Sequence, residues 1–166
     1  QKAINLGLET SLVTNGILLD DKARNIVVNA RYVYISLYGG TPQSYSAITG
    51  ARPEAFNAII KNVKELVRLR KERGTNLEIG VGFLIQPENY MEILSITEKI
   101  KQLGVNYIRF RATMEDKEGA MTSEQWSECY TYLREAKTRF SDDDFKVIIM
   151  YGEEEAKSLV KKDYPR

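Results

Sequence analysis

Five short apolar segments alternate with stretches of helical periodicity along this sequence of 166 residues. The apolar segments are rich in Val, Ile, Tyr and Phe and are bounded by Gly, Asn or Pro, which is typical of β-strands. Each separation leaves room for a helical crossover, so consecutive strands are expected to run parallel. The predicted strands cover residues 8–14, 32–38, 77–85, 106–112 and 145–151.

Two of the intervening helices have recognisable ends. Pro53 opens a long apolar stripe at helical spacing, and Gly74 closes it after a run of basic residues. Asn89 is predicted to cap the next helix, and the Glu92 carboxylate at the third helical position is predicted to complete a capping box. After the last strand, Glu153 leads into a further predicted helix.

Five β/α units without an antiparallel hairpin signal leave two α/β architectures, an open doubly wound sheet and an arc of a barrel. A closed (β/α)8 barrel usually needs about 250 residues, which this chain does not have. A partial, TIM-like barrel of about five parallel strands therefore fits better. Residues 1–166 are expected to form one domain of this kind.

Charge and residue content exclude several classes of function. The formal net charge is +1, so nothing in the composition favours nucleic acid or a membrane as a partner. Histidine is absent and Cys129 is the single cysteine, which removes histidine-based catalysis, an internal disulfide and a multi-thiolate metal site. Cys129 falls on an apolar helical face and is predicted to be a buried, unreactive thiol. A reducing cytoplasm is the expected location.

The first residues of the sequence have the pattern of the last turn of a helix. Residues 2–7 form one helical turn closed by Gly7, and the chain opens on Gln1 rather than on methionine. We therefore expect the sequence to be a fragment that lacks the preceding β/α units of its own chain.

Alternation along the strands separates the side chains into two faces. The aliphatic face of each strand is suited to packing under helices, so the opposite, mixed face is expected to line the interior of the barrel. Ligands of such folds bind at the carboxyl ends of the strands. The mixed face carries Tyr34, Ser36 and Tyr38 in the second strand, Glu78, Gly80, Gly82 and Leu84 in the third, and Tyr107, Arg109 and Arg111 in the fourth.

The glycines on or near this face have two interpretations. Gly80 and Gly82 weaken a strand, so they indicate either clearance for a ligand or close packing inside the barrel. Residues 14–16 and 39–42 are typical of turns after strands, although the adjacent glycines at 39 and 40 would also let the backbone approach a ligand.

The two arginines also have two interpretations. Arg109 and Arg111 either form ion pairs with Glu78 or Glu115, or bind a carboxylate of a substrate or cofactor. The sequence alone does not decide between these roles.

Four segments together indicate a family. They are LVTNGILL at residues 12–19, VYISLYGGTP at 33–42, GVGFLI at 80–85 and LGVNYIRFR at 103–111. In this order and spacing they resemble the third to sixth β/α units of radical S-adenosylmethionine (radical SAM) enzymes. The resemblance covers roughly residues 1–113, and beyond them only the architecture is similar.

The resemblance implies a partial barrel that binds a [4Fe–4S] cluster and S-adenosylmethionine at its mouth. In this family a CxxxCxxC loop after the first strand supplies the cluster's thiolates, and the open iron binds the methionine end of the cofactor. Electron transfer from the cluster then yields a 5′-deoxyadenosyl radical, which abstracts hydrogen from the substrate.

The resemblance also assigns individual residues to the cofactor. Thr14 and Asn15 match a segment near its methionine end, while Ser36 and Tyr38 match the strand end that contacts the ribose. Further matches are Gly80, Gly82 and Leu84, on the strand that packs near the adenine and ribose, and Arg109 and Arg111, on the strand whose mouth-facing residues meet cofactor or substrate.

The sequence departs from the family at its most characteristic motif. It contains neither CxxxCxxC nor the Gly-Gly-Glu segment expected after the second strand, and Cys129 lies too far along the chain to substitute. Neither the cluster nor the cofactor is therefore expected to stay bound to this chain, which is expected to be inactive in isolation. The activity would belong to the whole protein, with a small-molecule or peptide substrate that the sequence does not identify.

Two other functions stay open at this point. The chain could be a barrel module without a cluster that serves as a scaffold or binding domain. It could also belong to an unrelated TIM-type enzyme that binds anionic substrates through Arg109 and Arg111.

Overall fold

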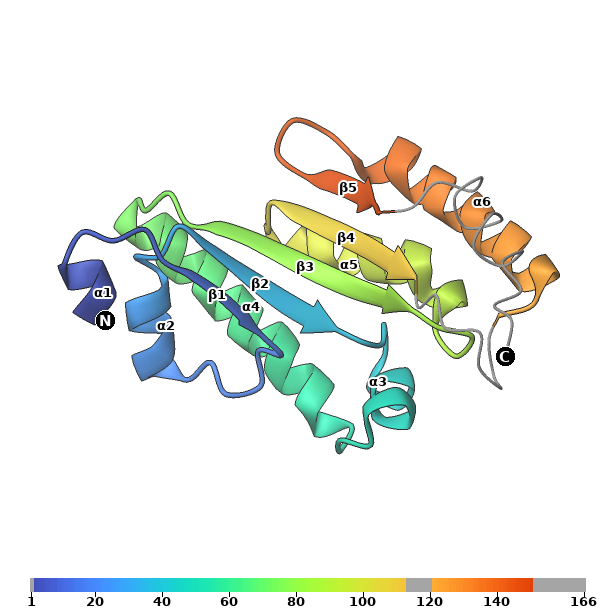
Figure 1. Ribbon diagram of the computed structural model, residues 1–166, viewed down its shortest axis with the longest axis horizontal. Coiled ribbons are helices and arrows are strands. Elements are labelled where there is room, and N and C mark those ends of the chain that lie inside the picture. The colour runs from blue at the N-terminus through green and yellow to red at the C-terminus, as the bar shows by residue number, and fades with distance from the viewer. Residues whose placement is uncertain (1, 113–120, 151–166) are drawn as a thin grey trace, which may run out of the picture.

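The computed structural model describes residues 2–112 and 121–150. They form one five-stranded parallel sheet in the order β1-β2-β3-β4-β5 (Figure 1). The strands are β1 (Ser11–Thr14), β2 (Tyr32–Leu37), β3 (Glu78–Ile85), β4 (Tyr107–Ala112) and β5 (Lys146–Ile149).

Each predicted strand is present, and the differences lie at the strand ends. The first is the largest, because β1 begins at Ser11 rather than at residue 8 and pairs with only four residues of β2. Three predictions fall on residues outside the described ranges: the end of the last strand at residue 151, the Glu115 partner of the arginines, and the helix after Glu153.

The helices include one that the sequence did not predict. The sequence indicates a loop at residues 39–42. In the structure, Thr41 accepts a hydrogen bond from the Ser44 amide and caps a helix that begins at Pro42. The predicted end at Gly74 is confirmed, since this glycine adopts the left-handed conformation. The helices are α1 (Lys2–Asn5), α2 (Asp21–Val27), α3 (Pro42–Thr49), α4 (Glu54–Arg73), the 3-10 turn η1 (Tyr90–Glu92), α5 (Ile93–Leu103) and α6 (Ser123–Phe140).

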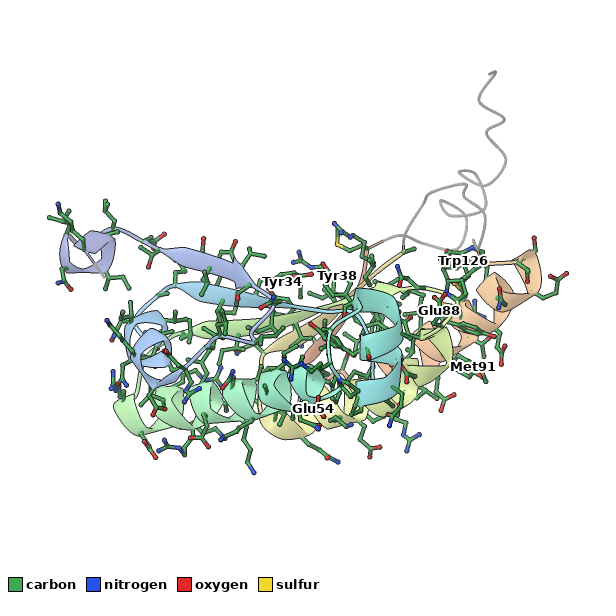
Figure 2. All side chains as sticks on the ribbon, turned by 90° about the horizontal axis from the view of Figure 1, so that it is seen from below. Tyr34, Tyr38, Glu54, Glu88, Met91 and Trp126 are labelled. Carbon is green, nitrogen blue, oxygen red and sulfur yellow. The ribbon has the colours of Figure 1, made fainter. Side chains whose placement is uncertain are left out.

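The strand order decides between the two architectures left open by the sequence. A doubly wound sheet reverses its strand order at one point, which sends its helices to both faces. Here the order is sequential throughout, and right-handed crossovers therefore place the helices on one face. Figures 1 and 2 show α4 and α5 together on that face, and no helix of the described residues covers the opposite face of the sheet. The fold is an α/β partial barrel, as predicted.

The core lies between this sheet face and the helices. Ile35, Val81 and Ile108 align across β2, β3 and β4, and each is at most 1% exposed. Phe83 and Phe110 form the next row, with ring centroids 5.6 Å apart. The prediction that the aliphatic faces pack under helices is confirmed. None of the described helices is long and apolar enough to span a bilayer.

Cys129 belongs to the part of this core contributed by α6. Its side chain is 0% exposed, and burial, with a smaller contribution from the charge of Glu128, raises the pKa of the thiol to about 12. At neutral pH the thiolate, which is the nucleophilic and metal-binding form, is therefore suppressed. The predicted buried thiol is confirmed.

The raised pKa gives a test of this packing. Between about pH 9 and pH 12 the folded state keeps a proton that the unfolded state has lost, so stability falls as pH rises through that window. In urea unfolding, the stability of the wild type relative to Cys129→Ala should shrink by about 2 kcal/mol between about pH 8 and pH 10.5. The ionisation of tyrosines contributes equally to both proteins, so it cancels in the difference between their free energies of unfolding. An identical pH dependence in the two proteins would contradict the burial of the thiol.

Candidate functional site

The open face of the sheet carries the side chains that the sequence assigned to the barrel interior. Strand register places Tyr34, Gly80 and Tyr107 in one row, and Ser36, Gly82 and Arg109 in the row nearer the carboxyl ends. Figure 2 shows Tyr34 and Tyr38 on the side of the sheet away from α4. We refer to the surface formed by these two rows, together with Leu84 and Arg111 above them, as the open face.

Two tyrosine rings cover the glycines of the open face. A Cβ atom on Gly80 would overlap the Tyr107 ring, and one on Gly82 would overlap the Tyr34 ring. The ring centroids of the two tyrosines lie 6.5 Å apart. Of the two interpretations of these glycines, the structure supports packing inside the barrel, because the space above them is occupied by the protein's own side chains.

Arg109 lies against both rings. Its guanidinium carbon is 5.5 Å from the ring centroid of Tyr34 and 5.5 Å from that of Tyr107, within the range of a cation–π interaction. The Nε atom is buried and has no hydrogen-bond partner. Burial raises the pKa of Tyr107, and the charge of Arg109 partly offsets that rise. Within the described part of the chain, the positive charge of Arg109 is thus held on the open face by two aromatic rings and by no carboxylate.

Arg111 is exposed near the carboxyl end of β4, opposite Leu84 of β3. The predicted ion pair with Glu78 is absent for both arginines among the described residues. Glu115, the other predicted partner, lies outside them. The Ser36 hydroxyl, half-buried on β2, likewise has no partner in the described part of the chain.

The carboxyl ends of β2 and β3 are joined by one buried amide. Asn89 is 0% exposed, and its Nδ2 atom donates to the carbonyls of Tyr38 and Leu84, each at 2.9 Å. Its Oδ1 atom accepts from the Gln86 amide at 2.8 Å. The side chain therefore fixes the backbone at two positions that the resemblance assigns to the cofactor.

Glu92 holds the loop that follows β2. Its carboxylate accepts hydrogen bonds from the Gly40 amide at 2.8 Å, the Thr41 hydroxyl at 2.8 Å and the Ser44 hydroxyl at 2.7 Å. The predicted capping box of Asn89 and Glu92 is wrong, because neither side chain bonds to the helix that it begins. Both reach across to a neighbouring strand or loop, and nothing in the local pattern distinguishes this use from a cap.

The loop after β1 is held in a similar way from α4. The Nδ2 atom of Asn62 donates to the carbonyls of Gly16 at 2.9 Å and Ile17 at 3.0 Å. Within the loop, Thr14 accepts from the Gly16 amide and Asn15 from the Ile17 amide, each at 3.1 Å. Thr14 pairs with Ile35, which puts it in a helix-facing row, whereas Asn15 is exposed. The structure therefore shows these two side chains in a local turn, and their assignment to the cofactor stays a prediction.

The described residues do not fit an iron–sulfur cluster. Within residues 2–112 and 121–150 no group of three or more His, Cys, Asp or Glu side chains is placed to hold a metal ion. Cys129 is buried in the helical layer, with its pKa raised to about 12. Any thiolates for a cluster would have to come from outside this sequence.

The packing of Tyr34 over Gly82 can be tested by a double-mutant cycle. Gly82→Ala should cost about 1–3 kcal/mol in the wild type, because the new methyl group displaces the Tyr34 ring. In a Tyr34→Ala background the same change should cost close to nothing in urea unfolding. Gly80→Ala is the matched control, because it meets Tyr107 and should keep its cost in that background. Equal costs of Gly82→Ala in both backgrounds would mean that the strand backbone, rather than the ring, requires the glycine.

The three hydrogen bonds of Glu92 predict how the loop after β2 responds to their loss. Glu92→Ala should lower the free energy of unfolding by about 1–3 kcal/mol. It should also speed hydrogen exchange of the Gly40 amide at least roughly tenfold under native conditions. The control is Glu98→Ala on the exposed side of α5, which removes the same charge without these bonds. Unchanged exchange at Gly40 would show that Glu92 does not hold the loop.

No protein-family model and no curated protein matches the sequence. Solved structures do match the fold. SuiB from Streptococcus suis bound to S-adenosylmethionine superimposes with a TM-score of 0.66 and 15% identity, over 91% of this chain and 33% of SuiB. TYW1 with a lysine-pyruvate adduct gives a TM-score of 0.58 and 19% identity, over 83% of this chain and 43% of that structure.

A third match is similar in length to this chain. A domain of pyruvate-formate lyase-activating enzyme from Bacteroides vulgatus ATCC 8482 gives a TM-score of 0.59 and 14% identity, over 90% of this chain and 86% of that domain. All three proteins are radical SAM enzymes, so the fold expected from the sequence resemblance is confirmed. The chain spans about a third of the length of SuiB.

Proposed function

We propose that this chain is the central part of a radical SAM enzyme, and that the carboxyl-terminal edge of its open face contributes to the site for S-adenosylmethionine. The observation that carries the proposal is a barrel arc with one face that no described helix covers. Near the carboxyl ends of this face, the Ser36 hydroxyl and the Arg111 guanidinium have no hydrogen bond or ion pair among the described residues. Folds of this class bind ligands at that edge.

The residues at that edge fit parts of the cofactor. The Ser36 hydroxyl can bond to a ribose hydroxyl, and the Arg111 guanidinium can donate to an acceptor atom at the adenine end of the cofactor. Leu84, half-buried between them on β3, offers an apolar contact for the adenine. Asn89 and Glu92 would not contact the cofactor themselves. They hold the backbone of Tyr38, Leu84 and the loop at Gly40 in place.

The proposal assigns the cluster to a different part of the protein. A cluster and S-adenosylmethionine together supply the 5′-deoxyadenosyl radical of this family, and the protein positions the reactants and excludes water. The described residues fit the role of the protein, which is to position the reactants and exclude water. Anaerobic reconstitution with iron and sulfide should therefore give no stable [4Fe–4S] absorption on the 166-residue chain.

Calorimetric titration of the chain with S-adenosylmethionine tests the proposed cofactor contacts. Because the cluster is absent, we expect only weak, reversible binding that does not persist through purification. Ser36→Ala should weaken this binding roughly fivefold and Arg111→Gln roughly 10- to 100-fold, because a hydrogen bond to a charged group is the stronger one. Arg52→Gln is the charge-matched control, since Arg52 is exposed beside α4 and away from the open face.

The outcome separates the rival functions. Binding that both variants leave unchanged would remove Ser36 and Arg111 from the cofactor site. No binding to the wild type would favour a barrel module that acts as a scaffold. Stable cluster formation on the chain would contradict the assignment of the cluster to another segment.

A further inference from the structure

The Tyr34 side chain reaches from one row of the open face into the next. Its backbone pairs with Gly80, whereas Ser36 pairs with Gly82, two residues nearer the carboxyl end of β3. The nearest atom to a Cβ built on Gly82 is nevertheless the Tyr34 hydroxyl oxygen. The ring therefore leans toward the carboxyl ends of the strands, and its hydroxyl lies over Gly82 in the row of Ser36.

The hydroxyls of Tyr34 and Ser36 are consequently neighbours at the proposed cofactor edge. Ser36 lies beside Gly82 on the adjacent strand, and adjacent strands are about 4.8 Å apart. A hydrogen bond between two oxygens spans about 2.8 Å. Two hydroxyls separated by one strand spacing can therefore reach the same oxygen atom, or the two oxygens of a vicinal diol.

The Tyr34 hydroxyl is available to a ligand. It has no hydrogen bond among the described residues, and it is not one of the buried polar atoms that lack a partner. The side chain is half-buried, and Figure 2 shows it on the side of the sheet away from α4. The tyrosines of the helical layer are different, because Tyr90 and Tyr132 both donate to the Glu128 carboxylate.

Neighbouring side chains hold this hydroxyl in position before a ligand arrives. The centroid of the Tyr34 ring lies 5.5 Å from the guanidinium carbon of Arg109 and 6.5 Å from the centroid of the Tyr107 ring. Any side chain at position 82 would meet the hydroxyl, so the glycine keeps its place free. A donor that is already ordered loses little conformational entropy on binding.

The chemistry of this pair of side chains fits a neutral ligand that carries hydroxyls. The hydroxyls of Tyr34 and Ser36 can each donate one hydrogen bond and accept another, as the hydroxyls of a ribose can. The proposed function already places the ribose at Ser36 and the adenine at Leu84, which lies two residues beyond Gly82 on β3.

We infer that the Tyr34 hydroxyl is a second contact for the ribose of the cofactor, beside that of Ser36. The inference rests on the proposed function for the identity of the cofactor. It adds a residue that the resemblance did not assign to the cofactor, because the backbone of Tyr34 lies one row below the site that its hydroxyl reaches.

Adenosine and 2′,3′-dideoxyadenosine are the probes, since they differ only in two ribose hydroxyls. In titrations followed on the backbone amides of Ser36 and Gly82, Tyr34→Phe should weaken adenosine binding roughly fivefold, through the loss of one neutral hydrogen bond. It should leave dideoxyadenosine binding unchanged. Tyr107→Phe is the matched control, because it removes a hydroxyl from the neighbouring ring, over Gly80, and should change neither affinity.

Three results with these variants would overturn the inference: unchanged adenosine binding in Tyr34→Phe, an equal loss for both nucleosides, or a comparable loss in Tyr107→Phe. The absence of saturable shifts with adenosine in the wild type would overturn it as well. Tyr34→Phe keeps the packed ring and should unfold at the same urea concentration as the wild type.

If Tyr34→Phe is less stable, the two nucleosides are compared on Ser36→Ala instead. Adenosine should then keep part of its advantage over dideoxyadenosine, since the Tyr34 hydroxyl is still present. Complete loss of that advantage would overturn the inference.

A titration with S-adenosylmethionine separates this inference from the proposed function. Unchanged binding in Tyr34→Phe, with weaker binding in Ser36→Ala and Arg111→Gln, would overturn the inference and leave the proposed function standing. A preference for adenosine that depends on Tyr34, in a wild type that does not bind S-adenosylmethionine, would support the ribose contact while the proposed function fails.

Discussion

The structure depends on burying one face of a parallel sheet under helices that all lie on the same side. Each β/α unit returns by a right-handed crossover to the next position in the sheet, so the strand order is sequential and the helices gather on one face. The rows through Ile35 and Leu37 are consequently buried. The same constraint places no described helix on the other face, where Ser36, Arg109 and Arg111 lie.

On that uncovered face, small and large residues are matched across strands. Gly80 and Gly82 of β3 leave room for the rings of Tyr107 and Tyr34, and those rings in turn hold Arg109. Side chains of β2, β3 and β4 therefore pack as one unit. The glycines of β3 make room for the tyrosine rings, and the rings position the Arg109 guanidinium. Burial of the Arg109 Nε atom without an acceptor among the described residues is costly.

The loops at the carboxyl ends depend on polar side chains from distant parts of the chain. Asn89 ties the end of β2 to the end of β3, Glu92 holds the loop at Gly40, and Asn62 holds the loop at Gly16. These bonds make the proposed cofactor edge a fixed backbone surface. Because Tyr38, Gly40 and Gly16 lie 46 to 52 positions from the side chains that bind them, local pattern reasoning cannot identify these bonds. It instead predicted a cap from Asn89 and Glu92.

The sequence by itself determined the positions of the strands, the ends of α4, the buried face and the burial of Cys129, because periodicity and turn residues act over a few neighbouring positions. It also indicated the fold through four segments in register. Only the tertiary structure decided that the strand order is sequential, that tyrosine rings cover Gly80 and Gly82, and that Arg109 lies against Tyr34 and Tyr107. Those features depend on which strands become neighbours and how far each side chain reaches, and such long-range geometry exists only once the chain has folded.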